Sequence, residues 1–135
     1  MSSTVISVDK KKVDPAAAAE LYIELGWGTA KRYSKERMRR SIANCDVVIF
    51  AVNESGELVA LLRALSDFAL ETKVLDLVIA PEYQRQGLGL TIMKHLAKAV
   101  RGTTIYFETE KKNFAFAAKA GYKKRKGLTV FRSDF

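Results

Sequence analysis

One corner of the chain constrains the fold more than any other feature. It consists of an apolar strand that ends in proline, a loop with two glycines, and an amphipathic helix. The strand reads KVLDLVIAP over residues 73–81, and the loop reads QRQGLG over residues 84–89. In the helix that follows, apolar residues recur every four positions, at Leu88, Ile92, Leu96 and Val100. The corner therefore predicts a buried strand that turns directly into the N-terminus of a helix.

The same corner has the chemistry of an anion site. Glycines at positions 87 and 89 let the backbone turn sharply and let a ligand approach it closely. The first turn of a helix has unpaired N–H groups, and the helix dipole adds partial positive charge there. Together with Arg85, these features predict a pyrophosphate site, with a plain tight turn as the alternative. The loop matches neither a P-loop nor the three-glycine dinucleotide fingerprint.

The other elements are expected around this corner. We expect a strand at 4–8, helices that begin at Asp14-Pro15 and Ser34, a β-hairpin over 46–65, a strand at 103–109, a helix at 111–120 and a closing strand pair turned near Gly127. This order predicts an α/β fold with a mixed, mostly antiparallel central sheet flanked by helices. At 135 residues, we expect one domain over residues 1–135.

Charge and cysteine content limit the possible binding partners and the cellular compartment of the protein. Lys and Arg number 23 against 15 Asp and Glu, and the net charge of +8 suits an anionic partner such as nucleic acid, acidic lipid or a phosphorylated cofactor. The single cysteine, Cys45, excludes an internal disulfide and is expected to be a packed thiol. With one histidine, no metal site is expected. No apolar run is long enough for a membrane span and the N-terminus lacks a signal-peptide core, so we expect a cytoplasmic protein without a membrane partner.

The segment LDLVIAPEYQRQGLG resembles the central motif of the GCN5-related N-acetyltransferase (GNAT) family, in particular its small bacterial and plant-plastid members. In that motif a strand L-x-V-x-P precedes Q/R-x-x-G-x-G/A. The residues that match are Leu77, Ile79 (for valine), Pro81, Gln84, Gly87 and Gly89. The resemblance runs from about residue 16 to the C-terminus and implies the acyl-CoA N-acyltransferase fold.

The resemblance also implies an acetyl-CoA site. Backbone groups of Leu77, Val78 and Ile79 would be unpaired where their strand splays from its neighbour. They would bind the pantetheine arm, and one N–H would polarise the thioester carbonyl. The loop residues expected around the pyrophosphate are Gln84, Arg85, Gln86, Gly87, Leu88, Gly89 and Leu90. Further cofactor contacts are expected from helix 111–120, through Asn113, Phe116 and the basic Lys111, Lys112 or Lys119.

The sequence departs from the family motif at a catalytic position. The tyrosine with which many family members protonate the departing thiolate is replaced by Ala117. Three tyrosines could substitute for it, although core or rim packing is the favoured explanation of each: Tyr83, Tyr106 and Tyr122. The acceptor amine needs a general base. Asp76 is the first candidate for that base, with Glu108 after it. An ion pair between Asp76 and Arg63 on the neighbouring strand is the structural alternative.

These observations predict an N-acetyltransferase that moves acetyl from acetyl-CoA directly to a primary amine, either a small amine or a protein lysine or N-terminus. The missing tyrosine motivates an alternative, a catalytically weak or inactive acetyl-CoA-binding module. Net charge and the run KKRKG at 123–127 motivate a nucleic-acid binder, which is less favoured because charge runs are usually solvated. The acceptor stays open, and so does the choice between monomer and homodimer.

Overall fold

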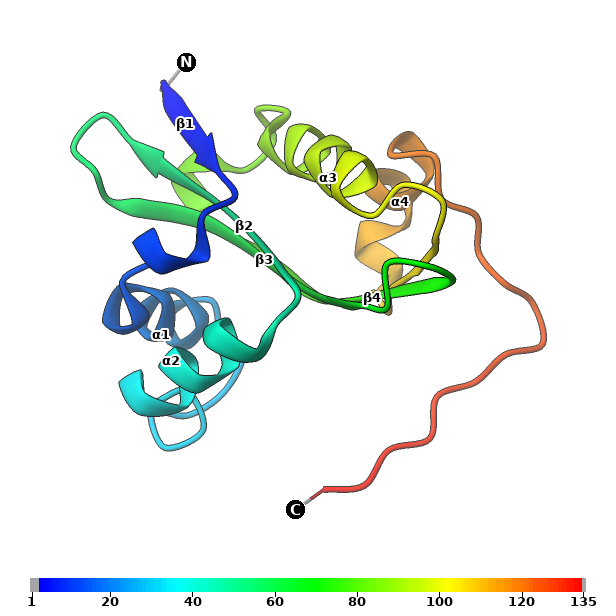
Figure 1. Ribbon diagram of the computed structural model, residues 1–135, viewed down its shortest axis with the longest axis horizontal. Helices are drawn as coiled ribbons and strands as arrows, with labels where there is room; N and C mark the ends of the chain where they lie inside the picture. The colour runs from blue at the N-terminus through cyan, green and yellow to red at the C-terminus, as the bar shows by residue number, and fades with distance from the viewer. Residues whose placement is uncertain (1–2, 135) are drawn as a thin grey trace.

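The computed structural model describes residues 3–134, which form a five-stranded sheet with helices on both sides (Figure 1). The strands lie in sequence order: β1 (Thr4–Ser7), β2 (Val47–Asn53), β3 (Leu58–Ser66), β4 (Glu71–Ile79) and β5 (Thr104–Tyr106). Neighbours from β1 to β4 pair antiparallel, and β5 pairs parallel with β4. The predicted mixed, mostly antiparallel α/β fold is therefore confirmed.

The helices divide between the two sides of the sheet. Helices α1 (Pro15–Glu24) and α2 (Lys35–Asn44) lie together on one side, and α3 (Leu88–Ala99) lies on the other (Figure 1). A short α4 (Phe114–Lys119) follows β5. The N-caps are those the sequence predicts, because the side chain of Asp14 accepts a hydrogen bond from Ala16 N and that of Ser34 accepts one from Arg37 N.

The β2–β3 hairpin forms the centre of the core. Every residue from Val47 to Ala51 is buried, so both faces of β2 are covered, as the continuous apolar run predicts. The hairpin turns at Asn53, whose Oδ1 accepts from the N–H groups of Ser55 (3.0 Å) and Glu57 (2.9 Å). Within residues 3–134, none of the helices has the length and apolarity that a bilayer crossing requires. The same residues hold no cluster of three or more His, Cys, Asp or Glu that could bind a metal ion.

The C-terminal third departs from the predicted elements. The strand expected at 103–109 is limited to Thr104–Tyr106, and the helix expected at 111–120 starts as a 3-10 turn, Lys111–Asn113. The closing strand pair is wrong: the chain turns at Gly127, but residues 123–134 form no strand and extend away from the body (Figure 1). Four consecutive cationic residues would occupy one strand of that pair, and a lone two-stranded hairpin is marginal in water.

Candidate functional site

The functional corner begins with a bulge in β4. Arg63 of β3 pairs with Asp76, whereas the next residue, Ala64, pairs with Val74, so Leu75 is an extra residue in β4. The parallel pairing of β4 with β5 ends at Lys73. Because a bulge bends its strand, β4 leaves β5 at this point. Its last residues therefore have an open edge.

Backbone alternation identifies which groups point to that open edge. The N–H of Ala80 donates to Val59 O (2.8 Å), so Ala80 and Val78 face β3. Leu77 and Ile79 consequently face the open side, as the sequence-based expectation requires. Val78 differs from that expectation, because its backbone groups point to Leu61 of β3. The carbonyl of Ile79 is already bound by the side-chain Nε2 of Gln84 (2.9 Å).

The glycine loop presents a run of free donors. Thr91 N donates to Gly87 O, but none of the N–H groups from Arg85 to Leu90 donates a hydrogen bond within residues 3–134. Gly87 is the N-cap of α3, with φ of +82°, a conformation that favours glycine. The side chain of Gln86 binds Glu82 O (2.8 Å) and so anchors the loop. Six consecutive free amides at a helix N-terminus are donors suited to an anion.

The second glycine has a different role from the first. A Cβ on Gly89 would lie 3.0 Å from Cε1 of Phe116 and 3.3 Å from Cδ1 of Ile79. A Cβ on Gly87 would meet nothing within 4 Å. Gly89 therefore lets α3 approach α4 and β4 closely, whereas Gly87 supplies the backbone turn. Phe116 packs beside the loop, and Asn113 is an exposed residue at the start of α4.

The tyrosines considered as proton donors occupy separate places. Tyr122 packs edge-on against Phe107, with ring centroids 4.9 Å apart, and burial raises the pKa of its hydroxyl. The hydroxyl of Tyr83 accepts a hydrogen bond from Nδ2 of Asn53 (3.1 Å). Tyr106 is 39% exposed on β5, the strand that borders the open edge of β4. The structure thus does not gather the three hydroxyls at one point.

Asp76 lies on the side of the sheet that α1 and α2 cover. Its carboxylate receives hydrogen bonds from Nη2 and Nε of Arg63 and from the hydroxyl of Tyr22 on α1. Another Arg63 nitrogen, Nη1, donates to Oγ of Ser41 on α2. Only 3% of the Asp76 side chain and 13% of the Arg63 side chain are exposed. The structural alternative considered for Asp76, the ion pair with Arg63, is therefore present.

The electrostatics of this buried network follow from its burial and its charges. Burial, with the adjacent Asp76 carboxylate, raises the pKa of the Tyr22 hydroxyl far above its usual range. Burial opposes the charge on Arg63, but hydrogen bonds to Asp76 and Tyr22 outweigh it and raise the pKa of the guanidinium. Tyr22 and Ser41 are members that sequence reasoning missed, because they lie 54 and 22 residues from their partners. Cys45 is buried and its pKa is raised, as expected for a packed thiol.

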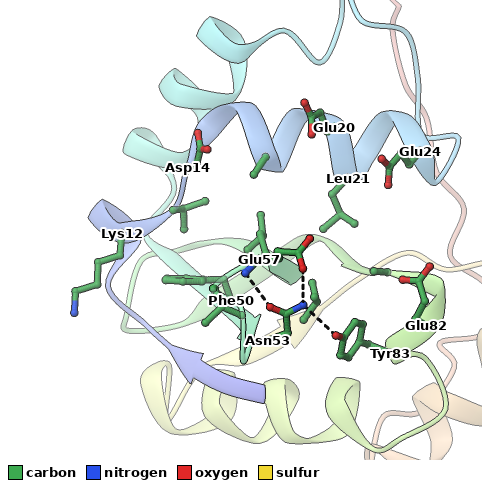
Figure 2. A pocket seen from close by; sticks show the side chains of 17 residues that line it. Lys12, Asp14, Glu20, Leu21, Glu24, Phe50, Asn53, Glu57, Glu82 and Tyr83 are labelled. Atoms are coloured by element: carbon green, nitrogen blue, oxygen red, sulfur yellow. Dashed lines mark hydrogen bonds between the residues drawn. The ribbon is translucent and has the colours of Figure 1, made fainter. Parts of the chain in front are cut away.

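A cavity of about 600 Å³ lies between α1 and the β2–β3 hairpin, beside Tyr83 (Figure 2). The carboxylates among its lining residues are Asp14, Glu20, Glu24, Glu57 and Glu82. Lys12 is the one cation in that lining. This excess of negative charge repels phosphate, so the cavity is unsuited to a pyrophosphate. The glycine loop, with its free amides and Arg85, is the suited surface.

Comparison with known proteins identifies the family to which the chain is similar. The family model described as "Acetyltransferase (GNAT) family" matches residues 17–122. A rice protein (Oryza sativa subsp. japonica) named serotonin N-acetyltransferase 2, chloroplastic, is 32% identical over 93 residues. That match covers 67% of this chain and 45% of the relative, so the chain corresponds to less than half of the relative's length.

Solved structures show the same fold at low sequence identity. A GNAT-family acetyltransferase from Streptococcus pneumoniae TIGR4 is similar with a TM-score of 0.79 and 23% identity, over 98% of this chain and 100% of that one. Glucosamine-6-phosphate N-acetyltransferase from Arabidopsis thaliana is similar with a TM-score of 0.73 and 15% identity, over 98% of both chains. At these identities the likeness concerns the fold.

Proposed function

The chain belongs to the acetyltransferase (GNAT) family, and on that premise we propose that it transfers the acetyl group of acetyl-CoA directly to a primary amine. We further propose that residues 1–135 act as one N-acetyltransferase domain. The observation that carries the proposal is the run of free N–H groups from Arg85 to Leu90 beside the open edge of β4. These residues fit a diphosphate attached to an extended arm, because the amides bind the anion and the open strand edge can pair with the arm.

Each part of the corner has a proposed role. The amides of residues 85–90 hold the pyrophosphate, and Arg85 adds positive charge at its exposed rim. Gln84 and Gln86 fix the loop through their bonds to Ile79 O and Glu82 O. Leu77 and Ile79 offer backbone groups to the arm. Phe116 borders the loop at Gly89, and Asn113 and the basic Lys111, Lys112 and Lys119 are proposed to add polar and positive groups from the α4 side.

The proposed reaction requires few side-chain groups. Acetyl-CoA supplies the activated acetyl group. The acceptor amine attacks the carbonyl carbon, a C–N bond forms, and the C–S bond breaks. The proton that the amine loses passes to a general base or to water, and the departing CoA thiolate takes up a proton to become the free thiol. In this proposal the N–H of Leu77, which points to the open edge of β4, donates to the carbonyl oxygen as negative charge develops there. Holding both reactants in line supplies much of the remaining rate enhancement.

The general base is a separate part of the proposal. Asp76 is the sequence-based candidate, and it lies next to Leu77 in β4. Both of its oxygens accept hydrogen bonds from Arg63 and Tyr22, which also suits a purely structural role. Glu108, the second candidate, is paired with Lys73 at 2.6 Å. The pH dependence of turnover in an Asp76→Asn variant separates these roles.

One observation favours a second candidate function, an acetyl-CoA-binding module with little or no turnover. Ala117 offers no proton to a departing thiolate, and the nearby Tyr122 packs against Phe107. The two functions differ in one measurement, the release of free thiol from acetyl-CoA. The panel of acceptors should contain polyamines, arylalkylamines, amino acids, aminoglycosides and lysine peptides, with mass spectrometry of each acetylated product.

Two variants make that experiment specific. Arg85→Glu places a carboxylate at the exposed rim of the loop and is expected to weaken acetyl-CoA binding about tenfold or more, through the loss of one charge-assisted contact and the gain of repulsion. Arg101→Glu, at an exposed position just after the C-terminus of α3, is the control with the same charge change. Binding without thiol release for every amine selects the binding module. Equal affinity of the Arg85→Glu variant and the wild type for acetyl-CoA would contradict the proposed site. A cytoplasmic location stays a prediction.

A further inference from the structure

The basic helix α2 is the sequence feature that the acetyl-CoA site leaves without a role. Its arginines have different surroundings. Arg39 is turned to Glu36, with two hydrogen bonds of 2.9 and 2.6 Å. Arg37 and Arg40 instead line a cavity of about 320 Å³ on the side of the sheet that α1 and α2 cover. Two of the four cationic residues of α2 therefore border one cavity.

The lining of this cavity consists mainly of hydrogen-bond donors. Arg32 comes from the loop between α1 and α2, and Arg63 comes from β3. Ser41 and Asn44 add a hydroxyl and an amide, and Tyr33 and Met38 complete the lining. None of the lining residues is a carboxylate. Glu36 is near in sequence, but Arg39 binds its carboxylate and lowers its pKa.

Arg32 and Arg37 are held in place by contacts that leave their charges without a carboxylate partner. Nε of Arg37 donates to the carbonyl of Arg32 (2.9 Å), which leaves both terminal nitrogens of Arg37 for a ligand. The guanidinium of Arg32 lies over the ring of Tyr33, 5.7 Å from its centroid. Arg63 is neutralised by Asp76 and also holds Ser41 at the base of the cavity. Among residues 3–134, no carboxylate forms an ion pair with Arg32, Arg37 or Arg40.

Three uncompensated guanidinium groups around one cavity repel one another, and a bound anion removes that cost. Guanidinium presents paired N–H donors that match the oxygens of a phosphate or a carboxylate. A cavity of this volume is suited to a compact group, whereas an extended nucleic-acid backbone is followed by a stripe of cations. We propose that the cavity formed by Arg32, Arg37, Arg40, Ser41 and Asn44 binds the phosphate or carboxylate group of a small molecule.

This site is separate from the glycine loop. The loop lies at the N-terminus of α3, on the other side of the sheet from α2 (Figure 1). The inference does not rest on the acetyltransferase proposal, since it uses none of the residues from Leu77 to Leu90. The floor of the cavity nevertheless adjoins the buried network, because Arg63 contacts both Ser41 and Asp76.

The experiment is an NMR titration of the ¹⁵N-labelled protein with inorganic phosphate, and separately with citrate, at a constant ionic strength of about 0.15 M. The expected result is saturable shifts in the amides of residues 37–44 and in the side-chain amide of Asn44. In the Arg37→Gln/Arg40→Gln variant, the phosphate Kd should rise about tenfold or more. The signals of Gly87 to Leu90 report any binding at the loop independently.

A matched control is available beside the cavity. Lys31→Gln/Lys35→Gln removes two positive charges from exposed positions that do not line the cavity and that form no ion pair within residues 3–134, and its phosphate Kd should stay within about twofold of wild type. Equal losses in the two double variants would overturn the proposal in favour of diffuse attraction. Absence of saturable shifts in residues 37–44 of the wild type, or tighter Arg37-dependent binding of a single-stranded oligonucleotide than of phosphate, would overturn it too.

Discussion

Arg63 and Asp76 face each other across β3 and β4, at the last pair of residues before the bulge that separates β4 from β5. Their ion pair is tied to α1 by the Tyr22 hydroxyl and to α2 by Ser41. One buried network thus joins both helices on this side of the sheet to β4, in which Leu77 directly follows Asp76. The conformation of β4 at the proposed acyl site depends on these contacts.

Asp76→Asn should lower the free energy of unfolding by about 3–5 kcal/mol, because it leaves Arg63 buried without its counter-charge. Urea unfolding at neutral pH measures this loss. The control is Glu36→Gln, which breaks the exposed pair with Arg39 and should leave stability nearly unchanged. Similar small effects of both substitutions would show that the buried network contributes little to stability.

The pH dependence of turnover tests Asp76 as the general base. With both oxygens engaged by Arg63 and Tyr22, we expect the activity that survives in Asp76→Asn to keep the wild-type pH profile. Initial rates between pH 6 and 9.5, taken over about the range in which amines and histidines titrate, provide the measurement. Loss of the acidic limb in the variant would instead establish Asp76 as the base.

Tyr22 should make the protein sensitive to alkali. Its pKa in the folded state is raised by burial and by Asp76, so the folded protein keeps a proton that the unfolded chain loses above pH about 10. The resulting stability is fully present below that pH and declines as pH rises further. Unfolding free energies from pH 8 to 11, about the span of tyrosine ionisation, should therefore fall more steeply in wild type than in Tyr22→Phe. Parallel curves would contradict the assignment.

Gly89→Ala should destabilise the protein by about 1–3 kcal/mol through overpacking against Phe116. The additional substitution Phe116→Leu should recover part of the loss, because it removes the ring atoms that the new methyl group meets. Gly87→Ala is the control: it should cost about 1–2 kcal/mol through its left-handed backbone, and Phe116→Leu should not relieve it. Thermal unfolding of the four variants measures both effects.

Removal of the chain after Gly127 should change the free energy of unfolding by less than about 0.5 kcal/mol. No backbone hydrogen bond joins residues 123–134 to the rest of the described chain, and Phe131 is 91% exposed. Denaturant unfolding of the truncated protein is the measurement. A loss well above that limit would mean that the tail packs on the domain in solution.

Most of what the sequence determined about the structure follows from local patterns. The β2–β3 hairpin, the N-caps at Asp14 and Ser34, and the strand–glycine–helix corner depend on residues close together in the chain. Their apolar periodicity, turn residues and caps are therefore readable without the fold. The family resemblance rests on the same corner, because the motif from Leu77 to Gly89 is contiguous.

Tertiary structure decided what depends on distant residues. Asp76 is 54 residues from Tyr22, and only the packing of α1 on β4 brings their side chains together. The cavity at α2 likewise needs Arg63 from a strand behind the helix. The prediction of the closing strands was wrong because their apolar residues have no partner surface, and no local pattern reveals this. Strand and helix signals are short-range, whereas burial, ion pairing and cavities result from which elements pack together.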